Sequence, residues 1–234
     1  AVEIGKAVIE EGGNVVDVAV AVGLTLAVTS PYFAALGGGG FALIKMNDSV
    51  DVLDFRETAP SKTSPSYYKD KAKDASITGG AAIGVPGFPA GLYALHKKYG
   101  KMRWQKLFKL PMRLANKGFA VSGDWVSHTQ RAADRFNPAG KKHFMRKPDK
   151  HYRPGQTLKQ KGLVKALKEF KRKNVKGFYE GFVAKDIVNT VKATGGDLTM
   201  EDMKNYKVRW LEPLTTDYMG HKLYLMPPPS SGGV

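Results

Sequence analysis

Arg56 is the side chain whose type and position in this sequence best suit the binding of a small acid. It follows an apolar run, residues 50–55, that has the composition of a buried strand. A guanidinium fixed at a strand end can hold a carboxylate through two parallel hydrogen bonds, which lysine cannot do. Arg56 could instead form a structural ion pair with Glu57 or Asp54. From the residues alone, the ion pair is the favoured interpretation.

The usual patterns of nucleophilic and metal-assisted catalysis are missing from the sequence. There is no cysteine, which excludes disulfides, thiolate metal sites and a cysteine nucleophile. No G-x-S-x-G motif occurs, and the histidines have no metal-ligand spacing. The five histidines are His96, His128, His143, His151 and His221. We therefore assign this chain no catalytic residue, no metal and no cofactor.

A run of four glycines, residues 37–40, follows an apolar helix-like segment and precedes a strand-like one. A phosphate-binding loop needs the opposite order, a strand before the glycines and a helix N-terminus after them. A nucleotide site is therefore not expected here. The run predicts a tight turn where two stretches of backbone pass closely, or an opening beside a substrate pocket.

The first sixty residues are expected to hold helices and a β-hairpin. Asn14 is a suitable N-cap, and Asp17 puts a negative charge in the first turn, where it suits the helix dipole. The helix that follows, residues 15–28, is apolar almost all round, which indicates burial, although its valines would also suit strands. The other expected elements are a first segment, 1–11, that ends at Gly12-Gly13, and two strands, 41–46 and 50–55, joined by Asn47-Asp48-Ser49.

Residues 61–206 are expected to be mainly helical. Glycines stop several of the helices, and Pro111 is expected to kink or split the second. The predicted helices cover residues 88–99, 103–117, 122–136, 157–173, 178–194 and 200–205. The polar stretch 137–155, which contains Pro138, Pro148 and Pro154, is predicted to be a loop.

Residues 207–234 are predicted to hold strands, up to residue 226, and then a motif of proline, serine and glycine. A proline run followed by Ser-Ser-Gly-Gly typically leads into another element, so we expect the fold to continue beyond Val234. No repeat and no linker divides the chain, which predicts one domain over residues 1–234. The longest apolar run is too short for a membrane span, which needs about 20 residues.

The formal net charge is +16, and it is unevenly distributed. Residues 1–60 carry three basic and eight acidic side chains, whereas residues 141–176 carry 14 basic and two acidic ones. Such a field attracts polyanions, anionic membranes or small acids. A lysine-rich, solvated face is the favoured interpretation, because the stretch has few aromatic residues for base stacking and little arginine. No nucleic-acid partner is expected.

An ordered set of segments resembles the γ-glutamyltranspeptidase family. The segment Asp54-Phe55-Arg56-Glu57-Thr58-Ala59-Pro60 is similar to the D-x-R-E-x-A-P motif of that family. The others are Ser30-Pro31 with Gly37-Gly38-Gly39-Gly40-Phe41, Gly84-Val85-Pro86-Gly87 with Ala90-Gly91, Lys98-Tyr99-Gly100, Phe178-Tyr179 with Gly181, and Pro227 to Gly233. They occur in the family's order and cover essentially the whole chain.

The resemblance implies an α+β fold, the αββα sandwich of N-terminal nucleophile (Ntn) hydrolases, of which this chain is a large-subunit portion. It also implies a precursor that cuts itself and exposes an N-terminal threonine on a small subunit. That threonine attacks γ-glutamyl compounds such as glutathione, with its own α-amine as base, and two glycine N–H groups of the small subunit hold the oxyanion. The family's arginine binds the α-carboxylate of the glutamyl group, a role that falls on Arg56.

Two features depart from the family pattern. No segment matches the processing site, and Thr215-Thr216 lie inside the chain, upstream of the proline motif, so neither is taken for the nucleophile. Ala34-Ala35-Leu36 stand where the family often has glycine and isoleucine. Alternative activities on the same fold are the processing of poly-γ-glutamate and the cleavage of acyl side chains of β-lactam antibiotics, as in a β-lactam acylase. A different class would be a polyanion-binding module that uses residues 141–176. The resemblance implies a periplasmic or secreted protein, although the sequence shows no signal peptide.

Overall fold

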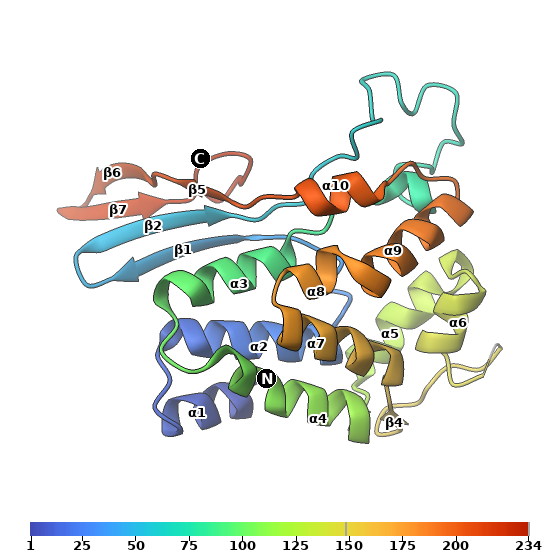
Figure 1. The fold of residues 1–234 in the computed structure, drawn as a ribbon, viewed down its shortest axis with the longest axis horizontal. Helices are drawn as coiled ribbons and strands as arrows, with labels where there is room; N and C mark the ends of the chain where they lie inside the picture. The colour runs from blue at the N-terminus through green and yellow to red at the C-terminus, as the bar shows by residue number, and fades with distance from the viewer. Residues whose placement is uncertain (148, 234) are drawn as a thin grey trace.

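A three-stranded antiparallel sheet and layers of helices make up the chain, for which a computed structural model describes residues 1–147 and 149–233. The sheet has the order β1 (Phe41–Met46), β2 (Ser49–Asp54) and β5 (Arg209–Leu211). Figure 1 shows this sheet along one side of the molecule, with the helices beneath it. Two further antiparallel pairs are β3 (Phe119–Ala120) with β4 (Thr157–Leu158), and β6 (Leu214–Tyr218) with β7 (His221–Leu225). The arrangement is α+β, as predicted.

Most of the helices lie below the sheet (Figure 1). The α-helices are α1 (Val2–Glu10), α2 (Val15–Thr29), α3 (Phe88–Tyr99), α4 (Lys109–Lys117), α5 (Gly123–Ala132), α6 (Pro138–Phe144), α7 (Lys161–Lys173), α8 (Lys176–Tyr179), α9 (Gly181–Ala193) and α10 (Met200–Asn205). Helices α1 and α4 lie farthest from the sheet, whereas α10 lies level with it (Figure 1). Three short 3₁₀ segments are η1 (Gly80–Ala82), η2 (Trp104–Phe108) and η3 (Ala133–Arg135). No helix of the described residues combines the length and apolar character needed to cross a membrane.

Helix α2 forms the centre of the hydrophobic core, and its helical prediction is confirmed. Val20, Leu24 and Val28 are fully buried along one side of it, and α2 packs against α1, α3 and α4. The Asn14 side chain accepts from the backbone of residues 16 and 17, while Asp17 accepts from the Asn14 N–H, which completes a capping box. This start signal explains why a valine-rich segment is a helix here and not a strand.

Asp17 also ties α2 to the segment that follows α3. Its buried carboxylate accepts hydrogen bonds from the backbone N–H groups of Lys101 and Met102, each at 3.1 Å, in addition to that of Asn14. Since no water reaches this carboxylate, these three donors have no alternative partner. The Asp17 carboxylate therefore accepts hydrogen bonds both from the start of α2 and from the distant turn at residues 101 and 102.

Asp17→Ala is expected to lower the free energy of unfolding by about 2–4 kcal/mol, because it removes an N-cap contact and leaves two further backbone donors unsatisfied. The measurement is urea denaturation of the intact protein. The matched control is Asp124→Ala in the first turn of α5, where an exposed carboxylate contributes about 0.3–1 kcal/mol. Equal losses in the two variants would contradict the role given to Asp17.

Several predicted boundaries are confirmed. Helices α3 and α10 occupy the predicted residues 88–99 and 200–205, and the predicted hairpin is the β1–β2 pair. Pro111 lies in a helical segment that is split as expected, into η2 and α4. Burial of both faces near the end of β2 is confirmed too, because Val52, Leu53 and Asp54 are all buried.

Three predictions were wrong. Residues 138–144 form helix α6 and not a loop, because Asn137 caps it by accepting from Gly140 and Pro138 occupies its first position. Residues 157 and 158 form β4, so α7 begins only at Lys161. The single helix predicted over 178–194 is interrupted at Glu180, whose extended backbone (φ −129°, ψ 169°) separates α8 from α9. The predictions made for Pro148 and Val234 lie outside the described residues.

Candidate substrate-binding site

The end of strand β2 fixes the main chain that carries Arg56. Beyond the last β1–β2 pair, the Phe55 N–H donates to the Gly40 oxygen at 3.0 Å, and the Gly40 N–H donates to the Phe55 oxygen at 3.2 Å. Phe55 itself is buried. Arg56 is therefore the first residue to leave the sheet.

Gly87, the N-cap residue of helix α3, and Gly91 within that helix leave the space that Phe55 fills. A β-carbon on Gly91 would overlap the Phe55 ring, and one on Gly87 would overlap the Phe55 carbonyl oxygen. Both contacts are closer than any real side chain tolerates, so only glycine fits at these positions. The segment that resembles the family's G-V-P-G motif thus holds the residue next to Arg56 in place.

The glycine run 37–40 packs flat against the same stretch of chain. A β-carbon on Gly39 would stand 2.6 Å from the Phe55 oxygen and 2.8 Å from a carboxylate oxygen of Glu57. The Gly38 oxygen accepts from the N–H groups of both Gly87 and Phe88, at 2.9 and 2.8 Å. The expectation of closely passing backbones is confirmed. The first N–H groups of α3 are thereby occupied, so they offer no anion site.

Asp54 and Tyr206 hold the main chain of Arg56 on its two sides. The Arg56 N–H donates to Asp54 Oδ1 at 2.8 Å, and the Arg56 carbonyl accepts from the Tyr206 hydroxyl at 2.8 Å. The second oxygen of the buried Asp54 carboxylate pairs with the guanidinium of Arg209. Asp54 is therefore the partner of Arg209, and the ion pair considered between Asp54 and the Arg56 side chain does not form.

Tyr206 remains a hydrogen-bond donor over the whole working pH range. Burial, together with the charges of Asp54 and Glu57, raises the pKa of its hydroxyl well above the usual range. Its ring stacks on that of Tyr179, with centroids 5.7 Å apart and planes 5° from parallel. The Tyr179 hydroxyl in turn donates to the Pro86 oxygen at 2.7 Å. These aromatic residues connect the Arg56 main chain to the motif before α3.

The guanidinium of Arg56 itself faces an open pocket. Its side chain is 60% exposed, and its contact with a carboxylate is an ion pair of 3.5 Å to Glu57. An exposed pair of this kind is weak, typically 0–1 kcal/mol, and leaves the guanidinium able to exchange partners. The pocket has a volume of about 340 Å³ and is lined by Gly37, Arg56, Glu57, Ala82, Ile83 and Gly84. The structure therefore brings together the glycine run, Arg56 and Gly84.

Two supporting residues were missed at the sequence level, Tyr206 and Arg209. They lie about 150 residues from Arg56 along the chain, and neither belongs to a segment with a recognisable pattern. Both residues reach the site only because β5 pairs with β2, which places Arg209 opposite Asp54. No local signal could have identified them.

The remaining candidate residues lie apart from this pocket. Thr215 and Thr216 belong to β6, in a different sheet from the one that leads to Arg56. His96 contacts the Met102 oxygen at 2.8 Å, and His143 contacts the Gln160 amide oxygen at 3.2 Å. Within residues 1–147 and 149–233, no group of three or more potential ligands could hold a metal ion.

The antiparallel sheet covered by helices has the α+β fold of the N-terminal nucleophile (Ntn) hydrolases, the class to which similar solved structures belong. Residues 1–234 match the family model described as Gamma-glutamyltranspeptidase. The chain therefore belongs to the γ-glutamyltranspeptidase family.

Known relatives agree with this assignment. The glutathione hydrolase proenzyme of Pseudomonas sp. (strain A14) is 41% identical over 99% of this chain, which spans 42% of that relative's length. The crystal structure of Helicobacter pylori γ-glutamyltranspeptidase superposes with a TM-score of 0.96 at 41% identity, covering 99% of this chain and 68% of that one. A cephalosporin acylase from Bacillus halodurans superposes with a TM-score of 0.87 at 25% identity, covering 97% of this chain and 43% of that one.

Proposed function

We propose that this chain is the large-subunit portion of an enzyme that cleaves γ-glutamyl amide bonds and transfers the glutamyl group to water, an amino acid or a peptide. The observation that carries the proposal is the Arg56 guanidinium, exposed in a pocket whose main chain is fixed by Phe55, Asp54 and Tyr206. Family membership and the proenzyme names of the relatives support it.

Arg56 is proposed to bind the α-carboxylate of the glutamyl donor. Two parallel N–H···O bonds would replace the long contact to Glu57, and charge-assisted bonds of this type are about twice as strong as neutral ones. Gly37 and Gly84 present no side chain to the pocket, so a glutamyl group can approach the backbone closely. The geometry thus suits recognition of the amino-acid end of the donor, at a distance from the bond that breaks.

The nucleophile is proposed to be an N-terminal threonine of a second polypeptide from the same precursor. Its hydroxyl oxygen bonds to the γ-carbonyl carbon while its proton passes to the threonine α-amine and then to the leaving amine. The C–N bond breaks and a glutamyl ester remains on threonine. Water or an acceptor amine then attacks the ester and releases the threonine. We place this enzyme outside the cytoplasm, as a periplasmic or secreted protein.

The intact protein is expected to release glutamate from glutathione, and a second polypeptide beginning with threonine should accompany the one described here. Glutamate release and N-terminal sequencing are the two measurements. Parallel assays with poly-γ-glutamate and with an acylated cephalosporin test the related activities. Turnover of the cephalosporin without turnover of any γ-glutamyl compound would overturn the proposal.

A further inference from the structure

A row of basic side chains runs along helix α4 on the side away from the core. Lys109, Arg113 and Lys117 are spaced by four residues and exposed, which places them in one stripe of the helix. Pro111 and Ala115 are buried on the opposite side. The three cations therefore project outward from the outermost helical layer.

Helix α7 carries a second row of the same kind. Lys161, Lys165 and Lys168 are exposed at spacings of four and three, while Leu167 and Phe170 are buried. The acidic residue of this helix, Glu169, pairs with Arg172 at 2.9 Å and with Lys173 at 2.7 Å. It does not reach the three lysines of the row.

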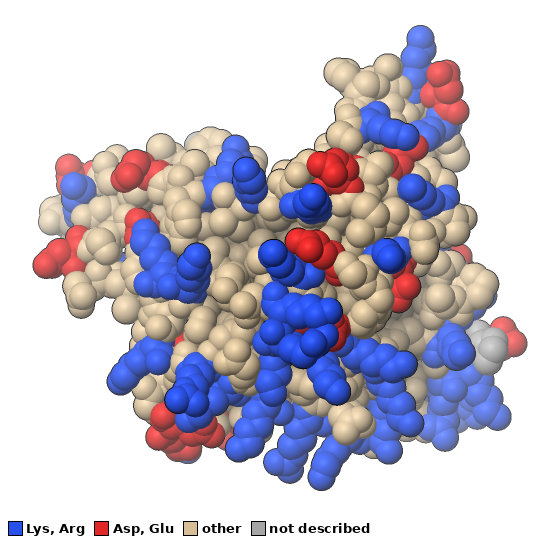
Figure 2. All heavy atoms as spheres, in the orientation of Figure 1, with Lys and Arg blue, Asp and Glu red and all other residues tan. Residues whose placement is uncertain are grey.

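The two rows lie on neighbouring helices, because α4 and α7 pack against each other. Figure 2 shows lysine and arginine side chains gathered along the lower edge of the molecule, over these helices. We call the six residues Lys109, Arg113, Lys117, Lys161, Lys165 and Lys168 the α4–α7 basic face. Within the described part of the chain, none of the six has a carboxylate within 4.0 Å. Like charges at this helical spacing destabilise the folded protein, and a partner of opposite charge would offset that repulsion.

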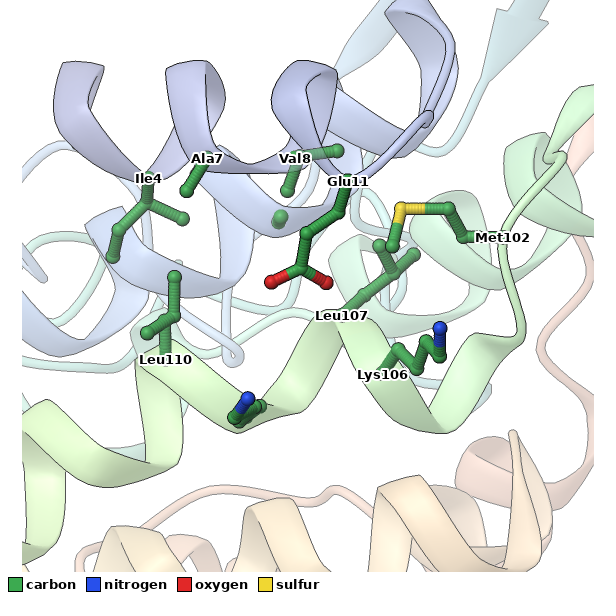
Figure 3. A pocket seen from close by; sticks show the side chains of 10 residues that line it. Ile4, Ala7, Val8, Glu11, Met102, Lys106, Leu107 and Leu110 are labelled. Carbon is green, nitrogen blue, oxygen red and sulfur yellow. The ribbon is translucent and has the colours of Figure 1, made fainter.

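Lys109 of the basic face also lines a small pocket. This pocket, between α1 and the η2–α4 segment, has a volume of only about 20 Å³, enough for a water molecule. Figure 3 shows Glu11 directing its carboxylate into this pocket, among apolar side chains such as Leu107 and Leu110. The face is therefore suited to an extended anionic surface.

The chemistry of the face selects between kinds of anionic partner. Five of its six cations are lysines, which act as point charges and do not form the bidentate contacts of arginine. Helices α4 and α7 themselves expose no large hydrophobic side chain, so the residues of the basic face offer neither base stacking nor insertion into hydrocarbon. Cations on two neighbouring helices match a plane of charges better than a single strand.

We propose that the α4–α7 basic face binds the anionic headgroups of a lipid bilayer and holds the protein peripherally on the membrane surface. Each lysine or arginine near such a surface adds to the attraction independently, and the attraction weakens with salt. This binding is separate from the Arg56 pocket and does not depend on the function proposed for it.

The test is co-sedimentation of the intact protein with vesicles of phosphatidylcholine containing 30% phosphatidylglycerol, against vesicles of phosphatidylcholine alone. Replacing Lys161, Lys165 and Lys168 together by glutamine is expected to lower the partition coefficient for anionic vesicles about a hundredfold. The control replaces Lys62, Lys69 and Lys73 by glutamine. These exposed lysines lie in the loop that projects from the other side of the molecule (Figure 1), and this triple variant should change partitioning less than about threefold.

Thermal unfolding and glutathione turnover in solution should be the same in both triple variants, which separates a binding loss from a folding defect. If the partition coefficient fell equally in the two triple variants, net charge alone would explain the binding, and the proposal would be overturned. So would equal binding of the wild type to neutral vesicles. Tighter binding to duplex DNA or to poly-γ-glutamate than to anionic vesicles at the same salt, removed by the α7 triple, would show that the partner is a polymer and not a membrane.

Discussion

Arg56→Ala is expected to lower kcat/KM for γ-glutamyl donors by about two orders of magnitude in the intact protein. The loss of a charge-assisted contact to the donor carboxylate costs about 2–5 kcal/mol. Stability should hardly change, because the lost ion pair to Glu57 is exposed and the two hydrogen bonds of residue 56 come from its main chain. Steady-state kinetics and thermal unfolding of the same preparation measure both quantities.

Two matched variants sharpen this experiment. Arg56→Lys keeps the positive charge but loses the two parallel N–H donors of the planar guanidinium. Its kcat/KM should therefore lie between those of Arg56→Ala and the wild type. Arg135→Ala removes an exposed arginine in η3, outside the pocket, and should leave kcat/KM unchanged. An unchanged kcat/KM in Arg56→Ala would show that this guanidinium does not bind the donor.

Gly91→Ala is expected to destabilise the protein by about 3 kcal/mol and to reduce kcat/KM, although Gly91 does not line the pocket. The added β-carbon would overlap the Phe55 ring, which must then shift within a packed core. Phe55 immediately precedes Arg56, so the shift displaces the guanidinium from its position beside Gly37 and Gly84. Thermal unfolding should show a fall in Tm of about 5–10 °C.

Gly162→Ala in α7 provides the control, since it is the same substitution in another helix. A β-carbon at Gly162 has no neighbour within 4 Å, and alanine favours the helical conformation over glycine by about 1 kcal/mol. This variant should therefore be equally stable or more stable, with unchanged kcat/KM. If Gly91→Ala behaved like Gly162→Ala, close packing at Gly91 would not support the site.

The elements with strong local signals could be predicted from the sequence. Helix α3 lies between two glycines, and α10 begins at Thr199, which forms a capping box with Asp202. The β1–β2 hairpin has turn residues between two apolar runs, and Asn47 adopts the left-handed conformation that such turns require. In each case the residues near in sequence determine the structure.

The predictions that failed depended on signals given too little weight or on distant contacts. Asn137-Pro138 is a helix start, but the surrounding prolines and lysines were taken to indicate a loop. Thr157 and Leu158 stand just before the helical pattern of α7, and they form a strand because residues 119 and 120 pair with them. That pairing is a tertiary effect, which local propensity does not contain.

The candidate site likewise combines residues that could be predicted from the sequence with contacts that depend on distant parts of the chain. Arg56 and the glycine segments were identified from the sequence through their resemblance to the family, and the structure places them around one pocket. The competing ion pair with Asp54 could not be excluded in advance, because its true partner, Arg209, is 155 residues away. Only the pairing of β5 with β2 reveals it.

The position of β2 at the centre of its sheet determines the order in which the protein can be assembled during synthesis. Its first neighbour, β1, precedes it by a short turn, but its second, β5, leaves the ribosome some 155 residues later. Until then one edge of β2 has no strand beside it, and the anchors of Arg56 at Tyr206 and Arg209 have not yet been translated. The helices between β2 and β5 therefore emerge while β2 is paired with β1 alone, and the main chain of Arg56 gains these two anchors only after residue 209 has been translated.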